Sequence, residues 1–402
     1  MTDRYLVLGF SIPDGEMKLE FEKDELPQIQ THLFNRNLIK CFESINNIRC
    51  EYLSFRPVSD YPLNKSLYLK KKKWHEKIGE FEIEIQEMPF INFGIFKIIS
   101  RLISVLFFVL HRVVTNRPKG IVVYSVHLPY MLTAWLATKL LRIELISVWT
   151  DPPSIDSKHD SKVKGMLRGC ESWLSRFLMS KSMKNIVLTK YLALDFSPGS
   201  QYEVVEGFID DFIKNVRQES KPNTKIVLYA GSLHERYGIL NLIKGFRNLD
   251  KPNIELHIYG RGDSESAIQD MIQEDKRIKY FGFVDNSIIK TRLSKASILI
   301  NTRSNSEYFV KYSFPSKTLE YISSGTPLMT TMLDSYPEQY KDYILELKDN
   351  APSTITERLD MAFLMDDKDL YDFGLKAKKF VQKNHYRHVA IRVERLLNSS
   401  KI

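Results

Sequence analysis

Glycine and arginine occur together in a segment of the second half of the chain that follows an apolar, strand-like run. Residues 231–238 read Gly-Ser-Leu-His-Glu-Arg-Tyr-Gly. Glycine lets the backbone approach a diphosphate closely, and the N-terminus of a following helix favours anionic groups. Arg236 adds a fixed positive charge and a fork of hydrogen-bond donors. The pattern predicts an anion-binding loop at a strand end; the alternative is a tight turn with a solvated arginine.

A second glycine pair lies at another expected strand end. Residues 259–262 read Tyr-Gly-Arg-Gly, and two glycines this close permit the tight approach of a ring or a ribose. By itself the segment favours a plain turn, so its interpretation depends on the other motifs.

A third segment, residues 301–327, joins a polar loop to the start of a helix. Pro315 and Ser316 are typical of a first helical turn. Lys317 then lies where a cation opposes the helix dipole, which a bound anion would compensate. Glu320 follows one turn later and is suited to bind the two vicinal hydroxyls of a ribose. The alternative is that Lys317 and Glu320 form an ordinary surface pair.

The first half of the chain offers two polar candidates at expected strand ends. His127 could position a substrate hydroxyl, or it could be a structural hydrogen bonder. Asp151 stands before Pro152-Pro153 and could equally be a turn former. We find no His, Cys, Asp and Glu spacing that is typical of a metal site, and we therefore expect none. Residues 367–369, Asp-Lys-Asp, are expected to lie on a solvated helical face.

The elements that must position these residues alternate between strands and helices. In the second half, strands are expected at 225–230, 255–259, 278–281, 297–301 and 327–330, with helices between them. The first half alternates similarly, and residues 372–398 read as one long basic helix. Such alternation predicts parallel sheets with right-handed crossovers. We expect an α/β protein with two facing Rossmann-like domains, residues 1–205 and 206–384, a ligand cleft between them, and a C-terminal helix at 385–402 that packs back on the first domain.

One apolar stretch, Ile95–Val114, contains Lys97, Arg101 and Arg112, and it is expected to be a buried or interfacial helix rather than a membrane span. Lys70–Lys73 precede it. Together with a second basic group they predict association with an anionic bilayer, the alternative being an ordinary solvated surface. That second group is Lys158, Lys162, Lys164, Arg168, Arg176, Lys181 and Lys184.

The composition is that of an ordinary soluble enzyme. Of 402 residues, 43% are hydrophobic and 27% are charged. The three cysteines fit neither a disulfide framework nor a zinc site, which indicates a reducing compartment. The net charge of +9 comes with no zinc-finger, homeodomain or RNP pattern, so nucleic acid is not an expected partner. No signal peptide is expected at the start of the chain.

Four segments resemble, in order and spacing, the donor-binding half of the retaining glycosyltransferases of family four, which have the GT-B fold. They are residues 231–239, 258–263, 280–282 and 313–327, and the similarity is closest to the bacterial capsule, O-antigen and exopolysaccharide branch. Residues 123–129 and 148–153 resemble, more loosely, two strand-end loops of the same branch.

The resemblance implies a metal-independent, retaining hexosyltransferase. It would move a sugar from a UDP- or GDP-sugar to a growing, lipid-linked, cell-surface polysaccharide, at the cytoplasmic face of the plasma membrane. Arg236 and Lys317 would hold the diphosphate, Glu320 the ribose, and the main chain near residues 280–284 the base. The implied donor site comprises Gly231, Ser232, Arg236, Tyr259, Gly260, Phe281, Arg303, Lys317 and Glu320, and the catalytic candidates are His127, Asp151 and Glu307.

The chain departs from the family pattern at several positions. Ser232 and Tyr237 replace basic residues of the family's glycine loop, and Tyr312, not Glu307, stands at the family's spacing from Glu320. Many relatives carry a cleft histidine where this chain has Trp149-Thr150-Asp151. These departures leave two alternatives open: a non-catalytic glycosyltransferase-like partner protein, and a sugar-nucleotide epimerase of similar architecture.

Overall fold

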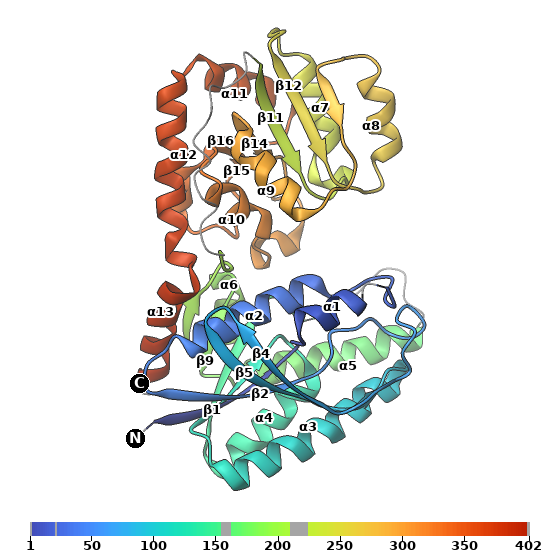
Figure 1. Ribbon diagram of the computed structural model, residues 1–402, viewed down its shortest axis with the longest axis vertical. Helices are drawn as coiled ribbons and strands as arrows, with labels where there is room; N and C mark the ends of the chain where they lie inside the picture. The colour runs from blue at the N-terminus through green and yellow to red at the C-terminus, as the bar shows by residue number, and fades with distance from the viewer. Residues whose placement is uncertain (1, 21, 154–161, 210–223, 400–402) are drawn as a thin grey trace. The chain divides into compact units, whose positions relative to one another are not determined.

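The computed structural model describes residues 2–20, 22–153, 162–209 and 224–399. The chain divides into two compact units. Unit 1 consists of Met1–Phe208 with Tyr386–Ile402, and unit 2 consists of Ile209–His385. Each unit is built on one large sheet (Figure 1).

Unit 2 contains a six-stranded sheet in the order β13-β12-β11-β14-β15-β16, and every neighbouring pair is parallel. This is the 3-2-1-4-5-6 order of a dinucleotide-binding fold, so its topological switch point lies between β11 and β14. The strands are Lys225–Ala230 (β11), Ile254–Tyr259 (β12), Ile278–Tyr280 (β13), Ile298–Asn301 (β14), Leu328–Thr331 (β15) and Leu345–Leu347 (β16).

The core of unit 2 forms where apolar strands meet apolar helix faces. Val227 of β11 and Ile298 of β14 pair in register and are fully buried. Phe246 of α7 packs into the same cluster. The helices are Ile239–Arg247 (α7), Glu265–Ile272 (α8), Asn286–Lys295 (α9), Ser316–Ser323 (α10), Pro352–Leu364 (α11) and Asp367–Val381 (α12), with 3-10 turns at Glu235–Tyr237 (η1), Tyr308–Tyr312 (η2), Glu338–Tyr343 (η3) and Gln382–Asn384 (η4).

Unit 1 contains an eight-stranded sheet in the order β10-β9-β8-β7-β1-β2-β5-β4, in which only the edge pair β4 and β5 is antiparallel. Its switch point lies at β1, between β2 and β7. The strands are Asp3–Gly9 (β1), Ile48–Ser54 (β2), Lys72–Ile78 (β4), Phe81–Glu87 (β5), Gly120–Tyr124 (β7), Glu144–Trp149 (β8), Lys184–Val187 (β9) and Gln201–Val204 (β10), and Tyr68–Leu69 (β3) pairs with Phe90–Ile91 (β6).

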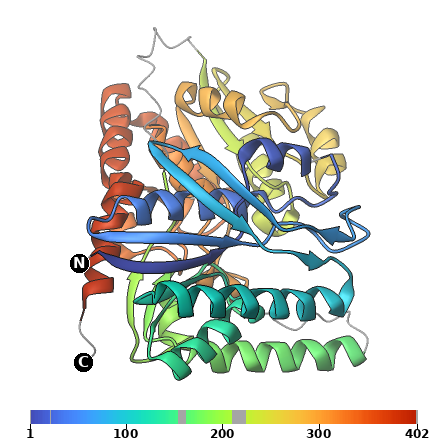
Figure 2. The same cartoon turned by 60° about the horizontal axis from the view of Figure 1, so that its bottom comes forward.

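The helices of unit 1 lie on both faces of this sheet. Figures 1 and 2 show α3, α4 and α5 together on one face, while the C-terminal helix α13 packs against α2. The helices are Asp14–Glu20 (α1), Ile29–Glu43 (α2), Gly94–Asn116 (α3), Leu128–Leu141 (α4), Lys162–Met179 (α5), Lys190–Phe196 (α6) and Tyr386–Asn398 (α13).

One expectation about local structure was wrong, and several elements were not predicted. The long helix expected at 372–398 is two helices, because the chain turns through η4 and becomes extended at His385, at the junction of the two units. Residues 72–78 form β4, where only the basic run Lys70–Lys73 was noted. β16 and α11 were not anticipated. The polar stretch at 214–224 is expected to end the linker between the two domains, and most of it lies outside the described residues, as does Lys158 of the second basic group.

Helix α3 has charged side chains on its buried face and large apolar side chains on its exposed face. Lys97, Arg101 and Ser104 lie on its buried face, whereas Ile103 and Phe107 are each 65% exposed. In the described part of the chain, this is the one helix that is long and apolar enough to cross a membrane by length and composition. The cations at 97 and 101 therefore do not break up the apolar surface, because they point into the protein.

Candidate functional site

The two glycine segments of unit 2 lie pressed together at the carboxyl ends of β11 and β12. A Cβ atom on Gly260, whose φ is +135°, would lie 1.8 Å from the carbonyl oxygen of Gly231, so this position requires glycine. Gly231 N–H donates to the Tyr259 carbonyl (3.0 Å), and Gly260 N–H donates to the Gly282 carbonyl (2.8 Å). The glycines thus bring the loops after β11, β12 and β13 to one edge of the sheet.

Two arginines meet on one tyrosine ring at this edge. The guanidinium carbons of Arg236 and Arg303 lie 5.1 and 5.3 Å from the centroid of Tyr237. Arg236 follows β11 and Arg303 follows β14, the two strands that flank the switch point. Open α/β sheets bind ligands in the crevice outside such strand ends.

The two guanidinium groups lack a counter-charge. Within the described parts of the chain, neither forms an ion pair with a carboxylate, and Arg303 Nε is buried without a hydrogen-bond partner. Burial lowers the pKa of Arg303, and the positive charge of Arg236 lowers it further. Two adjacent, uncompensated cations at a strand end make a site for an anion with more than one charge.

Lys317 and Glu320 bind each other. Lys317 Nζ lies 2.8 Å from Glu320 Oε2, within the first turns of α10, which is the surface pair of the alternative interpretation. Glu320 Oε1, however, is buried and has no hydrogen-bond partner. A carboxylate oxygen in that state can still accept a ligand hydroxyl. The nucleotide-binding roles of both residues remain predictions.

Replacing Glu320 with glutamine separates these roles. An i,i+3 ion pair contributes only about 0.2–0.5 kcal/mol, so we expect Glu320→Gln to change the melting temperature little. A ribose-binding carboxylate contributes a charge-assisted bond of about 1.5–3 kcal/mol, so the Kd for the nucleoside diphosphate should rise about tenfold or more. Calorimetry and thermal unfolding measure the two effects. Glu274→Gln, which removes the surface partner of Arg247, is the matched control. A loss of stability without a loss of affinity would make Glu320 structural.

An aromatic surface lies beside the glycine loops. Phe281, directly after β13, stacks on Tyr259 with ring centroids 4.8 Å apart and planes 10° apart. Tyr259 is buried, which raises the pKa of its hydroxyl, whereas Phe281 is 43% exposed. Arg261 lies over the neighbouring Phe283 ring at 4.2 Å. An exposed ring at this strand end can stack on a planar base.

Two predicted residues of unit 2 make no contact that assigns them a role. Glu307 is exposed and immediately precedes η2, where the hydroxyls of Tyr308 and Tyr312 lie 2.9 Å apart. Ser232 is exposed, and its carbonyl accepts the hydroxyl of Tyr229 (2.8 Å). The structure brings Arg236 and Arg303 together, but it does not attach Glu307 or the Ser232 side chain to them.

His127 and Asp151 belong to unit 1. His127 occupies the N-cap position of α4 without a side-chain capping bond, and it lies among the rings of Phe10, Phe55 and Tyr130, with centroids 5.0, 6.0 and 4.6 Å away. Asp151 is exposed and accepts the hydroxyl of Thr150 (2.9 Å). His127 is therefore held in a packed setting, and Asp151 in a surface turn.

Sequence reasoning missed the side chain that hydrogen-bonds His127. Arg101 of α3 lies 3.5 Å from His127 Nε2, yet it was read only as an interruption of an apolar stretch. The sequence feature that could have revealed Arg101 is a cation among apolar residues. Such a cation lies either on an exposed helix face or in the interior, where a buried charge is rare and often functional.

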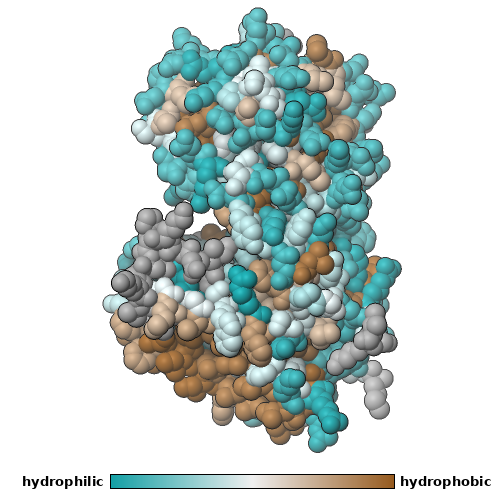
Figure 3. Space-filling view, turned by 180° about the vertical axis from the view of Figure 1, so that it is seen from behind, coloured by the Kyte–Doolittle hydropathy of each residue, from teal (hydrophilic) through white to brown (hydrophobic). Residues whose placement is uncertain are grey.

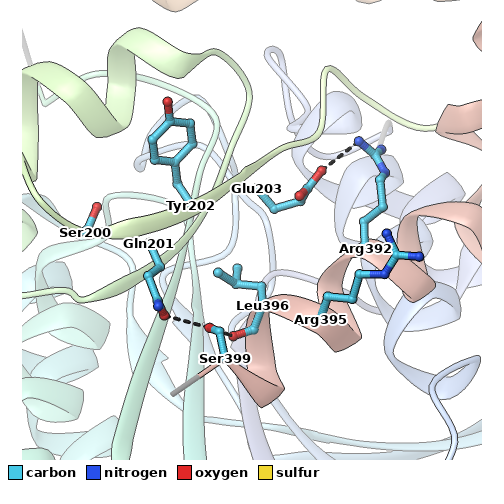
Figure 4. Close-up of a pocket in the computed structure, with 8 residues that line it drawn as sticks. All are labelled: Ser200, Gln201, Tyr202, Glu203, Arg392, Arg395, Leu396 and Ser399. Atoms are coloured by element: carbon cyan, nitrogen blue, oxygen red, sulfur yellow. Dashed lines mark hydrogen bonds and ion pairs between the residues drawn. The ribbon is translucent and has the colours of Figure 1, made fainter. Parts of the chain in front are cut away.

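One open cavity of unit 1, about 510 Å³, contains none of the predicted site residues (Figure 4). It lies between β10 and α13, where Arg392 binds Glu203 (2.7 Å) and Ser399 binds Gln201 (2.6 Å). Its other lining residues are Ser200, Tyr202, Arg395 and Leu396. No group of three or more His, Cys, Asp and Glu residues in the described ranges could hold a metal ion.

Comparison with known proteins connects unit 2 to one family. Residues 211–380 match the family described as glycosyl transferases group 1. No curated protein matches the chain in sequence.

Solved structures match over nearly the whole chain. HepE (Alr3699) of Anabaena, in complex with UDP, is 12% identical with a TM-score of 0.63, over 99% of this chain and 100% of that one. Sucrose-phosphate synthase of Thermosynechococcus elongatus is 12% identical with a TM-score of 0.64, over 98% of each chain. The lipopolysaccharide outer core galactosyltransferase WaaB is 16% identical with a TM-score of 0.58, over 98% of this chain and 99% of that one. The fold is therefore GT-B, with two Rossmann-like domains.

Proposed function

We propose that this protein is a retaining glycosyltransferase that moves a sugar from a UDP- or GDP-sugar to a growing, lipid-linked, cell-surface polysaccharide. The observation that carries the proposal is the pair Arg236 and Arg303, two uncompensated guanidinium groups on one ring at the switch point of unit 2. The match of this unit to glycosyl transferases group 1 supports it, as does the UDP bound to the similar HepE structure.

The chemistry follows from where charge develops. When the bond between the sugar and the nucleotide breaks, negative charge accumulates on the departing diphosphate. Arg236 and Arg303 donate fixed hydrogen bonds to it, and such preorganised donors act most strongly in the transition state. Lys317 leaves Glu320 for the diphosphate, and the freed carboxylate of Glu320 accepts the ribose hydroxyls. Phe281 offers the ring on which the base stacks.

The acceptor proposal rests on unit 1. Figure 3 shows a large apolar area over the part of the surface that contains α3. Residues 88–143 contain no Asp or Glu, so no carboxylate from this stretch repels an anionic surface. The exposed apolar side chains of α3 are Ile95, Phe96, Ile98, Ile99, Ile103, Phe107, Leu110 and Val114. An apolar ridge with cations at its border is suited to lie in the headgroup region of a bilayer, at the cytoplasmic face where a lipid-linked acceptor would be met.

A panel of nucleotide sugars tests the function. Incubation with UDP- and GDP-sugars should release the nucleoside diphosphate from one of them, and mass spectrometry should find the sugar on a saccharide acceptor. Binding of a nucleotide sugar without turnover would favour a non-catalytic partner, and a changed sugar on an intact nucleotide would favour an epimerase.

The reaction should persist in EDTA. Arg236 and Arg303 supply the positive charge that a divalent cation otherwise provides at a leaving diphosphate. The measurement is the initial rate of nucleoside diphosphate release with and without chelator. If activity disappears on chelation and magnesium or manganese restores it, the metal-independent mechanism is wrong.

A further inference from the structure

His127 lies where a ligand of unit 1 is expected. It lies three residues after the end of β7, and the switch point of this sheet lies at β1, next to β7. The Phe10 ring, just beyond β1, contacts the histidine ring edge-on at 5.0 Å. The Tyr130 hydroxyl joins the ends of β1 and β2 by donating to the Gly9 carbonyl (2.7 Å) and accepting from Phe55 N–H (2.9 Å). The setting of His127 is therefore rigid.

Arg101 reaches this point from the buried face of α3. It is 8% exposed, and its guanidinium lies 4.2 Å from the centroid of Phe90. It forms two long hydrogen bonds, each 3.5 Å, from one nitrogen to His127 Nε2 and from another to the Arg56 carbonyl. Arg101 Nε is buried without a partner. The nearby Asp60 does not bind Arg101, because it is held by Lys97 (2.5 Å).

The unfavourable burial of Arg101 indicates that its charge has a functional role. A buried guanidinium without a carboxylate is unfavourable, and burial lowers the pKa of Arg101 to about 10, which still leaves it charged at neutral pH. The guanidinium carbon lies 5.7, 5.2 and 4.2 Å from the ring centroids of Phe10, Phe55 and Phe90, so aromatic rings take the place of a carboxylate partner. Among side chains with a hydrogen-bonding atom in the described ranges, the imidazole of His127 is the one that the guanidinium contacts.

A guanidinium can only donate hydrogen bonds, so the His127 Nε2 that faces it must accept. A neutral imidazole then carries its one proton on Nδ1. This Nδ1 atom is buried and has no hydrogen-bond partner in the described protein. Its N–H is thus a donor that the protein itself leaves unused, at a strand end where ligands bind.

We infer that Arg101 is a positioning residue, which holds His127 as the neutral Nδ1–H tautomer so that this N–H donates to an oxygen of the bound sugar substrate. The inference rests on the proposed function for the identity of the ligand. It makes His127 a hydrogen-bond donor and not a base, because the lone pair of Nε2 points at a cation.

The charged groups around His127 agree with this role. Arg101 and Lys97 face it from α3, Asp60 neutralises Lys97, and the hydroxyl of Tyr130 on α4 is engaged elsewhere. Burial, then Arg101, then Lys97 keep the pKa of His127 well below its usual range. The ring accordingly stays neutral through the physiological range.

Nitrogen-15 NMR of the imidazole tests the tautomer directly in the full-length protein. The His127 signals are those lost in His127→Gln. We expect a protonated Nδ1 and an unprotonated Nε2 between about pH 5.5 and 8. Arg101→Met should release the ring to a mixture of tautomers and raise its pKa, whereas Arg101→Lys, which keeps a charged donor, should preserve the native signals. Arg112→Met, on the same helix but paired with Glu51 at the surface, should leave them unchanged.

Kinetics supply the functional readout. Arg101→Met should lower kcat for sugar transfer about tenfold and make the rate fall as the pH decreases toward 6, while Arg101→Lys restores most of the rate. A wild-type ring protonated on Nε2, or a tautomer indifferent to Arg101→Met, would overturn the inference. If no donor is turned over by the wild type, the proposed function fails, but the NMR result still decides the role of Arg101. Should Arg101→Met not fold, Arg101→Lys and the wild-type spectrum suffice for that decision.

Discussion

Arg303→Met should weaken the binding of the nucleoside diphosphate ten- to about a hundredfold and, at the same time, raise the melting temperature of the protein. The two effects have one cause. Arg303 is a partly buried cation without a carboxylate partner, close to a second cation, so the free protein is stabilised when the charge is removed. The same uncompensated charge attracts the diphosphate. A charge that destabilises the free protein but stabilises the complex with a ligand is typical of a binding site.

Arg236→Ala provides the second side of a double-mutant cycle. Because both guanidinium groups lie on the Tyr237 ring, we expect their contributions to diphosphate binding to be non-additive. Isothermal calorimetry with UDP and GDP gives the affinities, and thermal unfolding gives the stabilities.

Arg277→Met is the matched control for the arginine experiment. Arg277 lies in unit 2 but is fully engaged, with Asp275 (2.7 Å) and the carbonyl of Leu249 (2.6 Å). Its replacement should lower stability and leave nucleotide affinity intact, the opposite of Arg303→Met. If Arg303→Met and Arg236→Ala both bind the diphosphate as the wild type does, the donor site lies elsewhere.

Ile103→Gln with Phe107→Gln should reduce partitioning onto vesicles by about a hundredfold. Both side chains stand out from α3, and burying an apolar side chain of this size contributes about 1.5–3 kcal/mol. Because the replaced side chains are exposed in the free protein, the fold should survive. Sedimentation with vesicles containing anionic lipid measures the effect. The control is Met361→Gln with Leu364→Gln, which changes two exposed apolar residues of α11 in unit 2.

If the protein binds membranes as proposed, the basic contribution to that binding can be separated from the apolar one. Each cation near an anionic surface contributes about 1 kcal/mol and is screened by salt, whereas the apolar contact resists salt. Lys71 lies over the ring of Phe108, so the lysine run borders the ridge. Lys73 binds Glu84 (2.8 Å) and Lys72 lies 3.5 Å from Glu16, so these two contribute less than free lysines would.

Replacing Lys70–Lys73 with glutamine should therefore remove the preference for anionic over neutral vesicles, but not all binding, and nucleotide affinity should stay unchanged. Equal sedimentation of the wild type with neutral and anionic vesicles would contradict the basic contribution. If the wild type binds neither kind, the whole surface is ordinary and the acceptor is met in another way.

The sequence was sufficient for the alternation of elements and for the order of motifs along unit 2. β11 was predicted to the residue because Ile226–Ala230 is an apolar run between Lys225 and Gly231, and a strand buried on both faces requires such a run. The glycines at 231 and 260 stood out in the sequence, but the reason that position 260 requires glycine, its approach to the Gly231 carbonyl, is a contact between two strand ends that only the fold brings together. By contrast, β4 could not be predicted from sequence, because its charged residues form a strand only through antiparallel pairing with β5 at the edge of the sheet.

What only the tertiary structure decided is which charges have partners. Sequence spacing allowed Lys317 to be either a ligand residue or the partner of Glu320, and it said nothing of the ring that Arg236 and Arg303 share. It placed Arg101 in an apolar helix, but not whether the cation points to water or inward. Burial and counter-charges arise from contacts between residues far apart in the chain, such as Arg101 with His127, and the electrostatic cost of a charge depends on those contacts and not on its neighbours in sequence. Local sequence patterns therefore predicted most of the strands and helices, whereas the packing of distant residues determined which charges of the site have partners.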